Sequence, residues 1–321
     1  MLRVGIPEAV DPELHRLFPG EAALEVIPFE PKGPVEIEFW IAPPWTRQAL
    51  QVWPWLRGVR VVQATVAGID GLLPLIPEGV ILCDARGAHT ISTAEWTVTA
   101  ILSSLKYFPV YADVQRAGVW SRRKEGEDRF RSLHPSRPKI YPAVLSEELH
   151  GKRVLIVGYG DIGRAIEARL APFGVETVRV ARTPREGVHS VSELMELLPA
   201  ADIVVLIVPF TQETTGLMGA AQLECMKQGA LLVNAARGPV VDTKALLGAL
   251  QAGRIQAALD VTDPEPLPDG HPLWSAPNLL ITPHIAGSTP MFMARAVQFA
   301  AAQVGRYLRG EPLENVVTGE Y

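Results

Sequence analysis

Three side chains with complementary chemistry each stand beyond an apolar run in the second half of the chain. Arg237 follows "ALLVNAA", Glu265 comes shortly after "AALDV", and His284 closes "LLITPH". If these runs are neighbouring strands of an open parallel sheet, their carboxyl ends line one crevice, where the three side chains can converge on one ligand. The alternatives are a surface ion-pair partner for the arginine, a loop acid for the glutamate and a core residue for the histidine.

A glycine-rich turn follows the apolar run "KRVLIVG" and opens the helix-like stretch "DIGRAIEARLAPFG". In such a turn the first glycine permits the tight bend, the second lets the backbone approach a pyrophosphate, and the third allows close helix packing. The helix start also directs amide dipoles at the phosphate charge. In this context the motif predicts a dinucleotide site rather than a turn without a ligand, and it comprises Gly158, Tyr159, Gly160, Asp161, Ile162 and Gly163.

The strand expected after this helix ends without the acidic residue of the dinucleotide fingerprint. An Asp or Glu at that point accepts hydrogen bonds from the adenosine ribose, yet "ETVRV" is followed by Ala181, Arg182 and Thr183. A cation there suits a cofactor with a 2′-phosphate, and Arg185 offers further donors to it. The sequence therefore predicts a preference for NADP(H), with NAD(H) possible. The alternative is a solvated arginine in an enzyme indifferent between the two cofactors.

Composition favours a soluble globular protein of about two domains with small molecules as partners. The chain has 321 residues, 48% of them hydrophobic, and a net charge of -5, which argues against nucleic acid as a main partner. Cys83 and Cys225 lie in apolar segments without metal-ligand spacing, so reduced thiols and no metal site are expected. The absence of a signal-like start or a long apolar run predicts a cytoplasmic protein without membrane association.

Alternation of short apolar runs with longer amphipathic ones predicts βα units and parallel sheets. The expected strands of the first half are "RVGI", "EIEFW", "VRVVQAT" and "GVILCD"; those of the second are "RVLIVG", "ETVRV", "DIVVLIV", "ALLVNAA", "AALDV" and "LLITPH". A capping box at Ser92–Glu95 predicts a helix to Lys106, and Thr289–Pro290 predicts one to Arg309. The chain is expected to cross twice between a substrate domain, 1–102 plus 289–321, and an inserted dinucleotide-binding domain, 103–288. The basic stretch 121–139 is expected to form a solvated surface loop.

These motifs, in this order and spacing, resemble the NAD(P)-dependent D-isomer-specific 2-hydroxyacid dehydrogenases. The resemblance covers nearly the whole chain and rests on "GYGDIG", "NAARGPVVD", "LDVTDPEPLP", "HPLW" and "TPHIAGST". It implies a doubly wound Rossmann domain inserted in a smaller flavodoxin-like α/β domain. It further implies that Arg237 holds the substrate carboxylate and polarises its carbonyl, that His284 is the acid/base and that Glu265 pairs with His284. A neighbouring carboxylate would raise the pKa of the imidazole and keep it a competent acid near neutrality.

The resemblance also nominates further binding residues. The loop "ATVAGIDG" corresponds to one whose backbone amides bind the substrate carboxylate, with a plain strand-to-helix turn as the alternative; its residues are Val66, Ala67 and Gly68. Asp260 matches a position near the nicotinamide. The remaining expected cofactor contacts are Val208, Pro209, Thr214, Ala235, Ala236, His284 and Gly287.

The motifs are most similar to the glyoxylate/hydroxypyruvate reductase branch, so an NADP(H)-preferring reductase of glyoxylate or hydroxypyruvate is expected. A reductase of a bulkier 2-keto acid such as phenylpyruvate is an alternative. Another is a dinucleotide-sensing protein similar to the C-terminal binding protein corepressors, although no obvious disordered tail is present. Formate dehydrogenase activity is disfavoured because Glu265 stands where that branch has Gln. Family analogy implies a homodimer.

Overall fold

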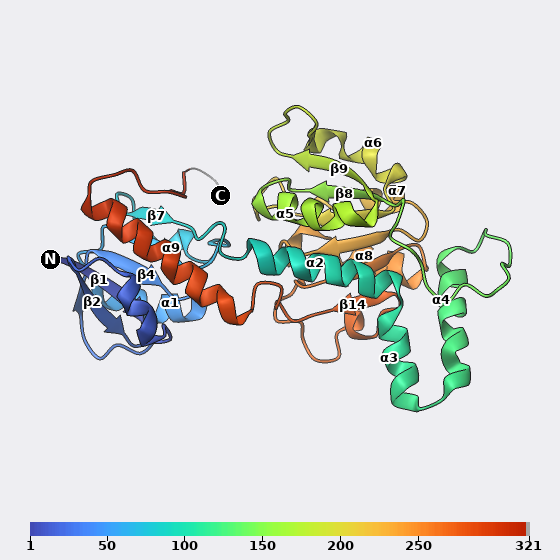
Figure 1. Cartoon of the computed structure of the whole chain (residues 1–321), viewed down its shortest axis with the longest axis horizontal. Helices are drawn as coiled ribbons and strands as arrows, with labels where there is room; N and C mark the ends of the chain where they lie inside the picture. Colours follow the sequence, from blue (N-terminus) through green and yellow to red (C-terminus); the bar gives the residue numbers. More distant parts are fainter. Residues whose placement is uncertain (319–321) are drawn as a thin grey trace. The chain divides into compact units, whose positions relative to one another are not determined.

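The computed structural model describes residues 1–318, and the chain divides into two compact units (Figure 1). One unit contains Met1–Thr90 and the chain from Ser288 onward, and the other contains Ile91–Gly287. The first division lies at the start of helix α2, Thr90–Leu105. The boundary at 102/103 that the sequence suggested would instead fall inside this helix.

The first unit is built on a five-stranded parallel sheet in the order β2-β1-β4-β6-β7, a flavodoxin-like arrangement. Helix α9 packs its Val297, Ala300 and Val304 against strand residues such as Val4 and Phe39. Thr289 is the N-cap of α9 and Pro290 its first residue, so the predicted start of this helix is confirmed. The elements of the unit are β1 (Leu2–Pro7), β2 (Ala22–Ile27), β3 (Val35–Glu36), β4 (Phe39–Ala42), α1 (Thr46–Val52), β5 (Leu56–Arg57), β6 (Val61–Ala64), β7 (Ile81–Cys83) and α9 (Pro290–Leu308).

The second unit contains a seven-stranded, entirely parallel sheet in the order β10-β9-β8-β11-β12-β13-β14. Relative to chain order this is 3-2-1-4-5-6-7, the doubly wound arrangement of dinucleotide-binding folds. The predicted Rossmann-type fold is confirmed, and the short strand β10 adds to the six strands that the sequence predicted. The elements are α2, α3 (Phe108–Ala117), α4 (Glu125–Leu133), β8 (Arg153–Val157), α5 (Asp161–Leu170), β9 (Glu176–Ala181), β10 (His189–Ser190), α6 (Leu194–Leu197), β11 (Ile203–Leu206), α7 (Ala220–Cys225), β12 (Leu231–Asn234), α8 (Thr243–Gln251), β13 (Gln256–Leu259) and β14 (Leu279–Ile281).

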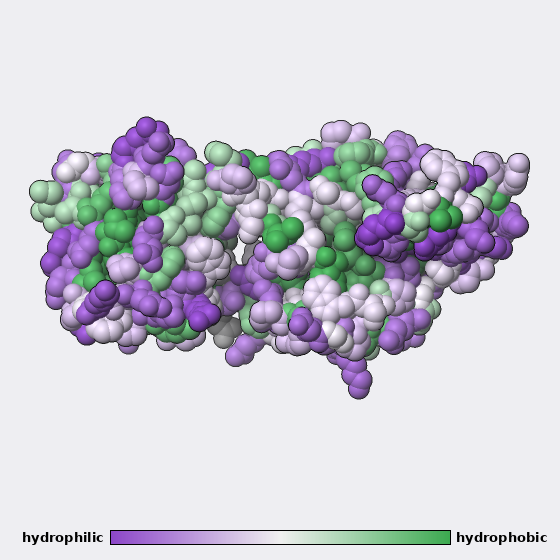
Figure 2. Space-filling view, turned by 90° about the horizontal axis from the view of Figure 1, so that it is seen from below, coloured by the Kyte–Doolittle hydropathy of each residue, from purple (hydrophilic) through white to green (hydrophobic). Residues whose placement is uncertain are grey.

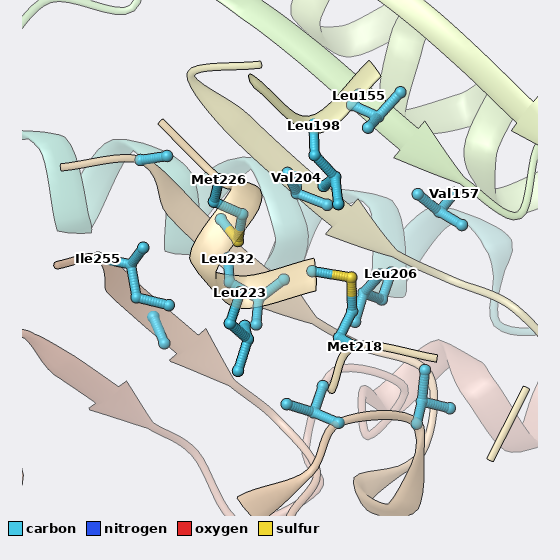
Figure 3. Close-up of a cluster of buried hydrophobic side chains, with 14 of the residues drawn as sticks. Leu155, Val157, Leu198, Val204, Leu206, Met218, Leu223, Met226, Leu232 and Ile255 are labelled. Atoms are coloured by element: carbon cyan, nitrogen blue, oxygen red, sulfur yellow. The ribbon is translucent and has the colours of Figure 1, made fainter. Parts of the chain in front are cut away.

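Alternate residues of the central strands enter different cores, as the two-residue period of a strand requires. Leu155 and Val157 of β8 share one core with Leu223 of α7 (Figure 3) and with side chains of α6 and α8. Val154 and Ile156 share the other core with side chains of α2 and α5. Because both faces are covered by helices, the strands are nearly continuous apolar runs. This packing fixes the edge of the sheet at which the functional loops emerge.

The predicted capping box at Ser92 is wrong. Helix α2 already begins at Thr90, and Ser92 and Thr93 are buried inside it. The Thr97 hydroxyl donates to the Thr93 carbonyl, one helical turn earlier. Burial of this turn against the sheet outweighs the local preference of serine for a helix start.

The basic stretch was expected to be a surface loop, and for much of its length this is wrong. Residues Trp120–Lys124 form a 3-10 turn, and Glu125–Leu133 form α4. Phe130 and Leu133 of α4 are buried in a cluster with Tyr107. The many charged residues made this amphipathic helix hard to recognise in the sequence, because its apolar face is covered by Tyr107 only in the folded chain.

The surface drawn in Figure 2 mixes hydrophilic and hydrophobic side chains. None of the helices within residues 1–318 is long and apolar enough to cross a membrane. Cys83 and Cys225 are free thiols, and burial, reinforced by the charge of Asp84, raises the pKa of Cys83 to about 12. Cys83 therefore stays protonated at neutral pH.

Candidate active site

The glycine-rich turn begins directly after β8, and two of its glycines are required by close backbone contacts. Gly158 has φ 106°, and a Cβ atom there would lie 2.5 Å from the carbonyl oxygen of Ile207. A Cβ on Gly163 would lie 2.9 Å from the Gly158 oxygen. The bend and the packing of α5 against it thus both exclude larger residues.

Gly160 differs because no atom lies within 4 Å of the place where its Cβ would be. It is the N-cap of α5, and no side chain caps the helix. The first amides of α5 are therefore available to an external acceptor, and the space beside Gly160 admits it. This cradle fits the pyrophosphate of a nicotinamide dinucleotide, and the backbone amides of Asp161, Ile162 and Gly163 would be the donors to it.

The end of β9 is cationic. Ala181 is half-buried, and Arg182 and Thr183 are exposed. Arg185 folds back over the glycine turn: its Nη2 donates to the Tyr159 carbonyl at 2.8 Å, and its guanidinium lies 5.7 Å from the Tyr159 ring centroid. The Arg185 guanidinium thus lies at the glycine turn, and Arg182 follows the strand end where the fingerprint expects a carboxylate.

The other expected cofactor residues occupy turns that leave the same sheet. Val208 and Pro209 follow β11, and the Thr214 hydroxyl donates to the Pro209 carbonyl at 2.8 Å, which closes that turn. The Ala235 amide donates to the Leu206 carbonyl at 3.2 Å. Gly287 follows the loop after β14 and is the last residue of the second unit. Thr214 thus shapes the backbone of its turn, and the cofactor contacts expected of these residues stay predictions.

The backbone at Arg237 is held in place by a buried asparagine, Asn234, which the sequence analysis did not identify as a functional residue. The Oδ1 of Asn234 accepts from the Ala236 amide at 3.0 Å, and its Nδ2 donates to the Arg237 carbonyl at 2.9 Å. A Cβ on Gly238 would lie only 1.9 Å from the Thr262 carbonyl oxygen. The arginine thus leaves a turn held by a side chain on one side and by backbone contact on the other.

Asp260 is almost fully buried, and its carboxylate accepts from three donors in the segment after β14. Oδ1 accepts from the Thr282 hydroxyl at 2.6 Å and the Ile285 amide at 2.8 Å, and Oδ2 from the Ala286 amide at 2.8 Å. The expected contact with the nicotinamide stays a prediction. What the structure places around this carboxylate is the loop that carries His284.

His284 and Glu265 form a hydrogen-bonded pair, with the histidine Nδ1 2.5 Å from Glu265 Oε1. This bond, partly opposed by burial and by the charge of Arg237, raises the pKa of His284. Burial disfavours the ionised form of Glu265, but His284 and Arg237 outweigh that effect and lower its pKa. The pair therefore favours an imidazolium beside a carboxylate, with the Arg237 charge acting on both.

The expected substrate loop lies in the other unit, after β6. Val66, Ala67 and Gly68 are partly exposed, and the Val66 carbonyl accepts from the Ala85 amide at 3.0 Å. Their predicted role in binding a carboxylate stays a prediction. Within residues 1–318, no group of histidine, cysteine, aspartate and glutamate side chains is arranged to hold a metal ion.

Comparison with known families identifies the family of this chain. Residues 98–286 match the model of the D-isomer specific 2-hydroxyacid dehydrogenase, NAD binding domain, which is more than half of the chain. The chain belongs to this family. It is an NAD(P)-dependent oxidoreductase of the 2-hydroxyacid dehydrogenase class, similar to the glyoxylate/hydroxypyruvate reductase branch.

Named relatives differ in substrate. The chain is 36% identical to a glyoxylate reductase of Thermofilum pendens over 79% of this chain and 73% of the relative. It is 33% identical to a D-3-phosphoglycerate dehydrogenase of Methanocaldococcus jannaschii over 81% of this chain, but it spans only about half, 47%, of that relative. A family member of Xanthobacter autotrophicus, solved in complex with NADPH and MES, is 29% identical with a TM-score of 0.73, and the match covers 98% of each chain.

Substitution of Gly158 and substitution of Gly160 should have different effects, the first on stability and the second on cofactor affinity. Gly158→Ala should lower the free energy of unfolding by about 2 kcal/mol or more, because it meets backbone at a positive φ. Gly160→Ala should fold with a stability within about 0.5 kcal/mol of wild type. Because its methyl occupies the cradle, its Kd for NADPH should rise about tenfold or more in calorimetric titration. Unchanged affinity in folded Gly160→Ala would place the pyrophosphate elsewhere.

The His284–Glu265 pair predicts a change in a measurable pKa. Glu265→Gln removes the negative charge that stabilises the imidazolium, so the pKa of His284 should fall and the ring should deprotonate at lower pH. Titration of the ring by NMR measures this, with His284→Ala identifying its resonance among the seven histidines. Glu193→Gln is the matched control, since Glu193 pairs with His189 elsewhere. A His284 titration curve that stays in place would show that the carboxylate does not set its pKa.

Proposed function

We propose that this dehydrogenase is an NADPH-preferring reductase of small 2-keto acids, with glyoxylate or hydroxypyruvate as substrate. The observation that carries the proposal is the hydrogen bond between His284 Nδ1 and Glu265 Oε1 beside the charge of Arg237. Reduction of a 2-keto acid needs a proton for the developing alkoxide and a cation for the carboxylate. The histidine and the arginine meet these needs. By analogy with the family, the enzyme works as a homodimer.

His284 serves as the proton donor in the reducing direction. Its Nδ1–H is directed at Glu265, which leaves Nε2–H to donate to the carbonyl oxygen of the substrate. Glu265 stabilises the imidazolium before transfer and accepts the same Nδ1–H from the neutral ring afterwards. The ring orientation is therefore maintained through the proton transfer.

Arg237 holds the substrate. A guanidinium forms two parallel hydrogen bonds with a carboxylate, which orients the adjacent keto group as well as binding the charge. Its position at the turn after β12 is fixed by Asn234. The nicotinamide of a bound cofactor would supply the hydride, and the glycine cradle would hold the pyrophosphate of the same molecule.

The cofactor preference rests on the residues at the end of β9. Arg182 is exposed, and Arg185 stands over Tyr159 of the glycine turn. A ribose 2′-phosphate accepts charge-assisted hydrogen bonds from such groups, whereas a carboxylate at position 181 would repel it. The NADPH complex of the Xanthobacter relative supports this choice.

Loss of the two catalytic side chains should have different kinetic signatures. His284→Ala and Arg237→Ala should each lower glyoxylate reduction by about 10²- to 10⁴-fold. The arginine variant should also raise KM, because it loses a binding contact, whereas the histidine variant should mainly lose kcat. Steady-state kinetics with glyoxylate, hydroxypyruvate, pyruvate and phenylpyruvate measures both effects. Near wild-type kcat in a folded His284→Ala protein would exclude the proposed acid, and a clear preference for phenylpyruvate would exclude the proposed substrates.

Cofactor selection is tested by restoring the missing carboxylate. In Ala181→Asp combined with Arg182→Ala, a charge-assisted contact worth about 1.5 to 3 kcal/mol is lost. The kcat/KM for NADPH should then fall roughly 10- to 150-fold, while that for NADH stays level or rises. Arg16→Ala, at an exposed position in the first unit, is the control for removal of a charge. A wild-type enzyme that uses NADH better than NADPH would contradict the phosphate site and leave the dehydrogenase assignment intact.

A further inference from the structure

A line of polar groups connects helix α2 with the loop of His284. The indole Nε1 of Trp96 donates to the Thr282 hydroxyl at 3.0 Å, and that hydroxyl donates to Asp260 Oδ1 at 2.6 Å. Trp96 and Thr282 are 186 residues apart in sequence. A hydroxyl has a single proton, and the indole can only donate. The proton of Thr282 is therefore committed to the carboxylate, and the direction of both bonds is determined.

The carboxylate at the end of this line holds the loop in an unusual backbone conformation. His284 has φ 54°, a region that residues other than glycine seldom adopt. Its amide donates to the Asp260 carbonyl at 2.7 Å, and the next two amides, of Ile285 and Ala286, donate to the Asp260 carboxylate. Such a conformation persists only where surrounding contacts over-determine it. The direction in which the His284 ring leaves the backbone thus depends on Asp260.

We propose that Thr282 and Trp96 are positioning residues for His284, acting through Asp260 without touching substrate or cofactor. The inference rests on the proposed role of His284 as acid/base. Thr282 completes the donor set of Oδ1, and Trp96 orients the hydroxyl that does so. Thr282 and Trp96 together hold the Asp260 carboxylate in place, and this carboxylate holds the loop of His284.

Removal of the hydroxyl has a defined local consequence. In Thr282→Val, Asp260 Oδ1 keeps only the Ile285 amide, and the indole N–H loses its acceptor. A buried carboxylate with fewer donors shifts toward the remaining ones, and the backbone of residues 284–286 follows it. The His284 ring then moves relative to Glu265, and proton transfer is sensitive to displacements of that kind.

The experiment compares Thr282→Val, Thr282→Ser and Trp96→Phe in single-turnover reduction of glyoxylate by NADPH at saturating concentrations. Thr282→Val should lower this rate about 10- to 100-fold, while its KM for glyoxylate in steady-state kinetics stays nearly unchanged. Trp96→Phe, which removes one donor and keeps the aromatic ring, should lower it about threefold to tenfold. Thr282→Ser keeps the hydroxyl and should resemble wild type. The double variant of Trp96→Phe and Thr282→Val should react as fast as Thr282→Val alone, because both changes break the same series of hydrogen bonds.

A second readout separates positioning from general destabilisation. The charged groups that act on His284 are Glu265, Arg237 and Asp260. If the loop relaxes, the bond between His284 and Glu265 weakens and the pKa of His284 falls. In the pH–rate profile, the decline of the reduction rate at alkaline pH, its alkaline limb, then moves to lower pH. Trp274→Phe is the matched control, because it removes an indole donor that bonds Pro268 elsewhere in the unit, and its rate and limb should stay as in wild type.

The outcomes distinguish this inference from the function on which it rests. Wild-type rates and an unmoved alkaline limb in folded Thr282→Val or Trp96→Phe, with His284→Ala inactive, would overturn the positioning role alone. An active His284→Ala would overturn the proposed function. Should Thr282→Val fail to fold, Trp96→Phe decides the matter by its rate and its limb.

Discussion

The parallel direction of all seven strands in the second unit is the constraint on which its chemistry depends. The last residues of five neighbouring strands, Val157, Leu206, Asn234, Leu259 and Ile281, are aligned in register across the sheet. Whatever follows each strand therefore emerges at one edge. The glycine cradle, the arginine turn, Asp260 and the histidine loop are neighbours for this reason, although the chain between them is long.

Buried polar side chains convert this coarse placement into a defined geometry. Asn234 and Asp260 close adjacent strands, and each uses its side chain to hold the backbone of a functional loop. Both are almost fully buried, so an unpaired amide or carboxylate at either position would be costly, and all of their described side-chain bonds go to loop groups. The energetic need to satisfy these side chains is what orients Arg237 and His284.

Electrostatics divides the edge of the sheet into two regions with different tasks. Near the glycine turn, Arg185 bonds the Tyr159 carbonyl and Arg182 is exposed, and the proposed phosphate site rests on these two cations. Near β12 and β14, a cation, a carboxylate and a histidine balance each other, so that the imidazole is favoured in its charged form. The proposed function assigns phosphate recognition to the first region and proton donation to the second.

Much of this was predictable from sequence because it is local. Apolar runs of strand length, the spacing of Gly158, Gly160 and Gly163, and the arginine after β9 are legible without tertiary contacts, as is the start of α9 at Thr289–Pro290. The failures have the same physical basis. Ser92 has the pattern of a helix cap but lies inside α2, and the charged stretch at 125–133 conceals a helix, because burial against other parts of the chain decided both. The partnership of Asp260 with the loop of His284, and of Trp96 with Thr282, belongs to tertiary structure alone. A hydrogen bond between residues 186 positions apart leaves no periodicity or spacing in the sequence, and it exists only once the sheet and α2 have packed together.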